Sequence, residues 1–261
     1  NIKENGGIRE AFNEARRQKT LYGEENVFDL SIGNPSAPAP RKVVDVIKKL
    51  SENVNLDHQY MCESGYEEVR SKIAGWMNQK YKTSYGINNI IMTNGVAGGL
   101  NMVLRALLNP GDEVLVFRPY YPAYIGFAEN WNGKIIEVDP GEDFQPDFED
   151  LEGKITKRTK VVIVNSPHNP TGVIYTKETA TKISEILKSK QKEYGHAICL
   201  LSDEPYRDLV YIEEELPWWP DFYQNTIVSY SFSKSLSLAG ERIGYLTIPT
   251  EFEDSENIIK A

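Results

Sequence analysis

The chain has 261 residues, and 29 Lys and Arg against 38 Asp and Glu give it a formal net charge of −9 at pH 7. This acidic balance disfavours binding to nucleic acid or to an anionic membrane through a broad basic face, so we expect neither as a partner. The longest uncharged stretch, residues 83–104, holds four Asn and four Gly and is too polar to span a bilayer. Two cysteines, Cys62 and Cys199, cannot build a disulfide framework, and no apolar leader begins the chain, which together predict a cytoplasmic protein.

The first 85 residues carry helical patterns rather than the strands of a sheet core. We predict helices from 8 to about 22, over 41–51 and over 66–81, with a turn-rich segment at 33–38. These elements are typical of an arm together with part of a small domain.

From about residue 90 onward, short apolar runs alternate with amphipathic helices. Seven strands are predicted, at 90–92, 113–117, 134–138, 160–164, 197–201, 226–230 and 244–248. Several of the runs are continuously apolar and are joined by helical or long crossovers, the longest helix covering about 177–194. This pattern predicts an α/β fold with a mostly parallel sheet covered on both faces.

Ligands of open parallel sheets bind beyond the carboxyl ends of the strands, so the residues that follow each strand are the candidate site. After the first strand, Gly95 opens a helix whose free N–H groups suit an anion. The loop has neither a Gly-x-Gly-x-x-Gly nor a Walker pattern, so a nucleotide is not expected there. Taken alone, this loop could be an ordinary strand-to-helix turn.

Three further strands end in polar residues. Asn169 sits in a rigid loop between two prolines, and Asp203 follows a buried strand, where a carboxylate needs a cationic partner unless it caps a helix. Lys234 follows the sixth strand, and Arg242 comes eight residues later. Lysine and arginine together predict a local positive pocket, which the overall charge does not indicate.

Together these segments resemble the class I and II aminotransferases, fold-type-I enzymes that use pyridoxal 5′-phosphate (PLP). The resemblance rests on Thr93-Asn94-Gly95, Pro119-Tyr120-Tyr121-Pro122-Ala123-Tyr124, Asn169-Pro170-Thr171-Gly172, Asp203-Glu204-Pro205-Tyr206 and Ser231-Phe232-Ser233-Lys234 with Arg242. It implies an aspartate-aminotransferase-like large domain, with a seven-stranded, mostly parallel sheet in an α/β/α sandwich. The implied domains are an arm with part of the small domain over residues 1–52, and the PLP-binding large domain over 53–261.

The resemblance also implies catalytic roles. Lys234 would form the Schiff base with the cofactor aldehyde and move the substrate proton. Free lysine has a pKa of about 10.4 and is mostly charged at neutral pH. A neighbouring cation such as Arg242 lowers this pKa and so favours the neutral amine that this chemistry needs. Asp203 would pair with the pyridinium nitrogen, and Asn169 and Tyr206 would contact the phenolic oxygen of the ring.

Further residues would bind the phosphate, the ring and the substrate. The implied phosphate ligands are Gly95, Val96, Ala97, Ser231, Ser233 and Arg242. Tyr121 matches the residue stacked on the ring. Tyr60 matches a tyrosine that reaches the phosphate of the partner subunit, which implies a homodimer. Gly33 and Asn169 match residues that contact the substrate, and no residue is assigned to a metal.

One departure from the family pattern is the short segment after Lys234, which has only 27 residues. The family continues into a C-terminal domain that supplies the arginine for the substrate α-carboxylate. We therefore expect the chain to lack that domain. The implied reaction moves an amino group between an L-amino acid and a 2-oxo acid, whose identities the motifs leave open.

Three alternatives compete with this interpretation. Ser231-x-x-Lys234 also fits penicillin-binding acyl-enzymes, but neither Ser-Asp-Asn nor Lys-Thr-Gly occurs in the chain. A non-enzymatic, aminotransferase-like effector domain of a transcription regulator would also bind PLP. A PLP-dependent lyase or synthase would share the same motifs, because electron withdrawal by the cofactor is common to all of these reactions.

Overall fold

The computed structural model describes residues 6–52, 60–213 and 215–260. The chain divides into two compact units, Asn1–Pro38 and Ala39–Ala261. The first contains helix α1 (Gly6–Tyr22) and the short helix η1 (Glu24–Asn26), so the predicted first helix is confirmed. The assignment of residues 1–52 and 53–261 to family domains stays a prediction.

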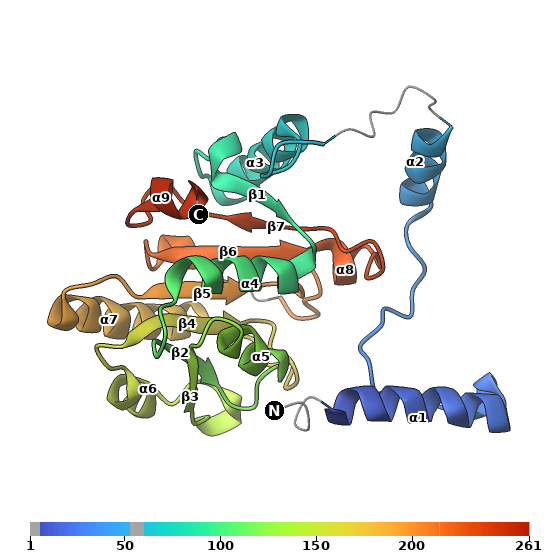
Figure 1. Ribbon diagram of the computed structural model, residues 1–261, viewed down its shortest axis with the longest axis horizontal. Helices are drawn as coiled ribbons and strands as arrows, with labels where there is room; N and C mark the ends of the chain where they lie inside the picture. Colours follow the sequence, from blue (N-terminus) through green and yellow to red (C-terminus); the bar gives the residue numbers. More distant parts are fainter. Residues whose placement is uncertain (1–5, 53–59, 214, 261) are drawn as a thin grey trace. The chain divides into compact units, whose positions relative to one another are not determined.

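The second unit is built on one seven-stranded sheet of order β1-β7-β6-β5-β4-β2-β3 (Figure 1). Its strands are β1 (Ile90–Thr93), β2 (Glu113–Phe117), β3 (Lys134–Val138), β4 (Thr159–Asn165), β5 (Cys199–Asp203), β6 (Thr226–Ser231) and β7 (Gly244–Thr247). Only β7 runs antiparallel to its two neighbours, and all other pairs are parallel. All seven predicted strands and the mostly parallel sheet are therefore confirmed.

Helices cover both faces of this sheet (Figure 1). The helices of the second unit are α2 (Arg41–Ser51), α3 (Glu67–Tyr81), α4 (Gly95–Leu107), α5 (Ala123–Glu129), α6 (Phe148–Lys154), α7 (Lys177–Tyr194), α8 (Phe232–Ser235) and α9 (Ser255–Lys260), with short helices η2 (Ile87–Asn89), η3 (Glu142–Phe144) and η4 (Trp219–Asp221). In the described part of the chain, no helix is both long and apolar enough to cross a membrane.

Successive residues of the strands point to different cores, as the pleat of a strand requires. Val161 and Ile163 of β4 pack in the cluster that includes α4 and α5, whereas Val162 and Val164 pack in the cluster that includes α6 and α7. A third cluster joins α3 to β1, β6 and β7. Burial on both faces explains why the strands are continuously apolar, and it confirms the predicted α/β/α sandwich.

Candidate active site

The carboxyl ends of four strands bring the predicted site residues to one edge of the sheet. Asn165, the last residue of β4, is paired with Asp203 of β5. Ser231, the last residue of β6, is paired with Gly244, which in turn is paired with Thr93 of β1. The loops that follow these strands therefore start next to one another, as expected for an open α/β sheet.

Asp203 is a buried carboxylate whose two oxygens differ in their surroundings. Oδ2 accepts a hydrogen bond of 2.5 Å from the hydroxyl of Tyr124 in α5. Oδ1 is buried and has no hydrogen-bond partner among the described residues. Burial raises the pKa of Asp203 to about 7, which the bond from Tyr124 opposes and the charge of Glu204 assists.

Asp203 is the last residue of β5, and no helix begins there. The alternative that it caps a helix is therefore wrong. Its main-chain oxygen accepts a bond of 2.8 Å from the amide of Asn165, whose side-chain oxygen accepts a bond of 2.7 Å from the backbone N–H of Asn169. Asn165 thus ties the proline-flanked loop to the strand that carries the carboxylate.

Lys234 lies in the single-turn helix α8 and is half-buried. Its Nζ is 6.0 Å from the centre of the Tyr206 ring. Burial lowers the pKa of Lys234, and the positive charge of Arg242 lowers it further. The direction agrees with the expectation from the sequence, although burial is the larger cause.

Tyr206 interacts with both the lysine and the carboxylate: Nζ of Lys234 approaches its ring, and the charge of Asp203 acts on its hydroxyl. Burial raises the pKa of Tyr206 to about 12, and the negative charge of Asp203 contributes to the rise. Its hydroxyl therefore stays protonated near neutral pH and can donate a hydrogen bond.

The guanidinium of Arg242 lies at the start of α4. Nη1 is 3.5 Å from Oγ of Ser233, and Nη2 is 3.4 Å from the carbonyl oxygen of Asn94. Gly95 has φ +70, and a Cβ there would lie 2.6 Å from Nη2 of Arg242. Only glycine leaves room for this approach without strain.

Around this guanidinium, the remaining candidate anion ligands fall into two groups. Val96 and Ala97 form the first turn of α4, and Ser231 and Ser233 are buried at the end of β6 and the start of α8. A planar cation, two hydroxyls and a helix N-terminus together are typical of a phosphate site.

Tyr121, Tyr60 and Gly33 complete the set of predicted residues. Tyr121 is 38% exposed, and its ring meets that of Tyr124 edge to face at 5.7 Å. Tyr60 is fully exposed at 107%, so its predicted contact with a partner's phosphate stays a prediction. Gly33 belongs to the first compact unit, and its contact with substrate likewise stays a prediction.

Two residues of this cluster have no role that the sequence predicts. Tyr124 is the last residue of the motif at 119–124, three residues after Tyr121, but nothing in its spacing indicates a bond to Asp203. Asn165 directly follows a predicted strand, which was the available signal for it. Both act through contacts between distant segments, which a single sequence does not reveal.

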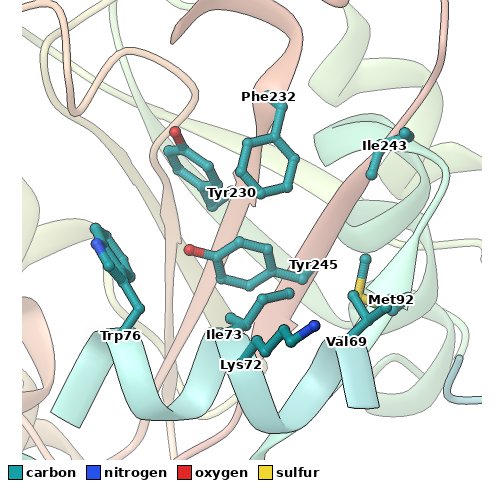
Figure 2. Close-up of a pocket in the computed structure, with 9 residues that line it drawn as sticks. All are labelled: Val69, Lys72, Ile73, Trp76, Met92, Tyr230, Phe232, Ile243 and Tyr245. Carbon is teal, nitrogen blue, oxygen red and sulfur yellow. The ribbon is translucent and has the colours of Figure 1, made fainter. Parts of the chain in front are cut away.

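A separate apolar cavity of about 350 Å³ lies between α3 and the strands β6 and β7. Figure 2 shows Tyr230, Phe232 and Tyr245 on one side of it, and Ile73, Trp76 and Lys72 of α3 on the other. Neither Lys234 nor Asp203 lines this cavity. It is therefore distinct from the polar cluster at the sheet edge.

Comparison with known proteins identifies the family. Residues 25–261 match the family described as aminotransferase class I and II. The chain is 31% identical over 259 residues to a probable aspartate aminotransferase of Methanocaldococcus jannaschii, covering 99% of this chain and 64% of that protein. It is 32% identical over 237 residues to an aspartate aminotransferase of Thermotoga maritima, covering 89% and 61%.

A solved structure gives the same answer for the fold. An amino transferase from Eubacterium rectale matches with a TM-score of 0.91 and 41% sequence identity, over 97% of this chain and 65% of that one. The chain thus spans less than two thirds of the length of each of these relatives. The match covers nearly the whole sequence, and the expected family resemblance is confirmed: the chain belongs to the class I and II aminotransferases.

Proposed function

We propose that this chain is the cofactor-binding part of a PLP-dependent aminotransferase that moves an amino group between an L-amino acid and a 2-oxo acid. The observation that carries the proposal is the pair formed by Asp203 and Lys234 in one site. The first is a buried carboxylate with one oxygen unpartnered among the described residues, and the second is a half-buried lysine with a lowered pKa.

The residues present fit PLP at each of its polar groups. Oδ1 of Asp203 is an acceptor suited to the N–H of a cationic ring. Arg242, the buried serines and the start of α4 offer donors and positive charge for a phosphate. Tyr121 presents a partly exposed aromatic ring on the segment that leads into α5.

When bound, PLP supplies an aldehyde that combines with amines and a protonated ring that withdraws electrons from the carbon losing its proton. Lys234 would hold the cofactor covalently through Nζ until the amino group of the substrate replaces it, and the neutral amine released in this way would accept the proton from the substrate carbon and return it. Because burial and Arg242 both lower its pKa, more of the amine is neutral at physiological pH.

Asn169 and Tyr206 would donate hydrogen bonds to the phenolic oxygen of the ring. The support for Tyr206 is its raised pKa, which keeps the hydroxyl protonated, and the approach of its ring to Nζ of Lys234. The support for Asn169 is the bond from its backbone to Asn165, which fixes the loop beside β5.

The working unit that we propose is a homodimer in which Tyr60 of one subunit completes the phosphate site of the other. The fully exposed side chain of Tyr60 supports this arrangement, since a buried tyrosine could not reach a neighbouring subunit. Relatives named as aspartate aminotransferases suggest an acidic amino donor, although a relative in Bacillus subtilis is named for N-acetyl-LL-diaminopimelate.

A single-turnover experiment tests the reaction class. Protein loaded with PLP is mixed with a panel of L-amino acids, and each 2-oxo acid product is measured without any acceptor present. We expect at least one donor to give its matching 2-oxo acid in an amount no greater than the bound cofactor, and Lys234→Ala to give none. Repeated release of pyruvate and ammonia would identify a lyase. Bound cofactor with no product from any donor would favour a binding-only effector domain.

A further inference from the structure

We propose that Tyr124 is a positioning residue for Asp203, which favours the charged form of its carboxylate and turns it so that Oδ1 is offered to a cationic ring nitrogen. The inference rests on the proposed function, because the ring nitrogen belongs to the cofactor that we propose. It assigns a role to a residue whose part in the site the sequence does not indicate.

The position of Tyr124 is fixed on several sides. The side chain is 2% exposed and its hydroxyl donates to Oδ2 of Asp203 at 2.5 Å. Its ring lies edge to face against Tyr121 at 5.7 Å and is stacked on Tyr120 at 6.4 Å. A donor held by two rings can turn little, so the carboxylate oxygen that it binds is fixed as well.

Oδ1 is then the only oxygen of the Asp203 carboxylate that is available to a ligand. The main chain of Asp203 is held by Asn165 and by the pairing of β5 with β6, and Oδ2 is held by Tyr124. Oδ1 is buried without a partner among the described residues. A buried carboxylate that receives one hydrogen bond is incompletely satisfied, and a cationic N–H is the donor that completes it.

Tyr124 also opposes the groups that disfavour the charge on Asp203. The titratable groups that interact with this carboxylate include Tyr124 from α5, the adjacent Glu204 and Tyr206 from the following turn, and the half-buried Lys234 lies in the same site with its Nζ near the Tyr206 ring. The neighbouring strands contribute the neutral residues Asn165 and Ser229. Burial and Glu204 raise the pKa of Asp203, and the hydrogen bond from Tyr124 lowers it.

The phenol remains a donor under these conditions. Burial and the charge of Asp203 both raise the pKa of Tyr124 well above 10.0, so its proton stays on the phenol. Without this hydroxyl, the pKa of Asp203 would be higher, and less of the carboxylate would be charged at neutral pH to face the ring nitrogen.

The first test needs no cofactor. Protein labelled with ¹³C at the aspartate carboxyl is titrated by NMR, and the Asp203 signal is assigned by its loss in Asp203→Asn. Tyr124→Phe keeps the ring and removes the hydroxyl, and we expect it to move the Asp203 titration upward by about 1 to 2 pH units. Replacement of Tyr124 by 3-fluorotyrosine, a stronger donor, should move it downward. An unchanged titration in both proteins would overturn the inference.

Tyr223→Phe is the matched control. It also removes a buried phenolic hydroxyl, which donates to the carbonyl of Ile198 at 2.7 Å, before the start of β5 and so at the opposite end of that strand from Asp203. A loss of stability through a missing buried hydroxyl would appear in both variants. Only Tyr124→Phe should move the Asp203 titration.

The second test uses PLP labelled with ¹⁵N at the ring nitrogen. In the wild-type protein and in Tyr223→Phe we expect the nitrogen to be protonated at neutral pH, and in Tyr124→Phe to lose its proton at lower pH, with PLP bound about 10-fold more weakly. If the wild-type protein binds no PLP, the proposed function fails, while the ¹³C titration still decides whether Tyr124 controls Asp203. If PLP binds and the ring nitrogen titrates alike in wild type and Tyr124→Phe, the positioning role is wrong and the proposed function stands.

Discussion

Two adjacent carboxylates at the end of β5 are buried in different ways. Glu204 forms an ion pair of 3.1 Å with Arg207, and both side chains are 4% exposed. Arg207 in turn lies over the rings of four aromatic residues, Trp76, Tyr81, Trp218 and Tyr230. Asp203 is equally buried, and its Oδ1 has no hydrogen-bond partner among the described residues. Glu204 contributes through Arg207 to the packing of α3 on the sheet, and Oδ1 of Asp203 is available for a ligand.

The first prediction concerns the pH dependence of stability without cofactor. Asp203 stays protonated up to about pH 7 in the folded protein but ionises near pH 4 when unfolded. Between these values the folded state binds more protons, so its contribution to stability falls as pH rises, by up to about 1.4 kcal/mol for each pH unit. Asp203→Asn removes this contribution to the pH dependence of stability, because asparagine does not titrate. Urea unfolding should show that the stability of the variant relative to wild type increases from pH 4 to 7 and then levels off.

The exposed Asp45 of α2 provides the control for this measurement, because Asp45→Asn removes no buried charge. A stability difference between wild type and Asp203→Asn that is the same at pH 4 and pH 8 would contradict the raised pKa.

The second prediction concerns the ion pair beside it. Arg207→Met leaves the buried carboxylate of Glu204 without its partner, which typically costs about 3–5 kcal/mol. Adding Glu204→Gln should recover a large part of that loss, because the remaining group is neutral. Both free energies of unfolding are measured in urea. A loss below about 1 kcal/mol for Arg207→Met would show that the pair contributes little.

At the scale of elements, the site depends on how α4 begins beside β7. Gly244 is paired with Ser231 and Thr93, and a Cβ on Gly244 would lie 2.5 Å from the carbonyl oxygen of Tyr230. Gly95 leaves the same kind of space for Arg242. The two glycines thus let the start of α4, the end of β6 and the guanidinium come together at one place.

The third prediction tests this arrangement. Gly95→Ala places a Cβ 2.6 Å from Nη2 of Arg242 and requires a positive φ of an alanine. We expect it to weaken PLP binding at least 10-fold, through displacement of the guanidinium, and to destabilise the fold by about 1 kcal/mol. Gly75→Ala in α3 is the control, since its Cβ meets nothing within 4 Å and alanine favours a helix by about 1 kcal/mol. Equal PLP affinity in wild type and Gly95→Ala would show that the displaced guanidinium does not bind the phosphate.

Most elements could be predicted from the sequence, because hydrophobic periodicity reports burial directly. The limits of β5 could not: the apolar run begins at 197, whereas the ladder includes Cys199 to Asp203. Pairing with neighbours decides the limits of a strand, and a single strand does not contain that information. For the same reason the antiparallel direction of β7 was not predicted. The bonds made by Tyr124 and Asn165 likewise link segments that are 79 and 38 residues apart in the chain.

At the scale of the whole molecule, the chain covers 61–65% of the lengths of the three relatives compared above, and the shared-site homodimer is a proposal. Exposed apolar side chains occur close together in the segment that includes Tyr60: Met61 is 53% exposed, Tyr66 45% and Val69 40%. A second subunit would cover such a surface, and it would bring the partner's Tyr60 to the phosphate.

The fourth prediction separates a shared site from a site within one chain. Tyr60→Phe and Lys234→Ala are each expected to bind PLP poorly. Mixing the two proteins forms hybrid dimers in which one site has Lys234 from one chain and Tyr60 from the other. We expect PLP affinity at that site to return to the wild-type value in equilibrium binding measurements. Absence of recovery, although hybrid dimers form, would exclude the contribution of Tyr60 across the interface.

The central claim is that Lys234 holds the cofactor, and covalent trapping tests it most directly. Protein incubated with PLP is reduced with borohydride, digested and mapped by mass spectrometry, with Lys80→Ala as a control that removes a different lysine near Asp208. The account predicts a pyridoxyl group on Lys234 in the wild-type protein and in Lys80→Ala, and none in Lys234→Ala. A pyridoxyl group on another lysine of the wild-type protein, or on none, would contradict it.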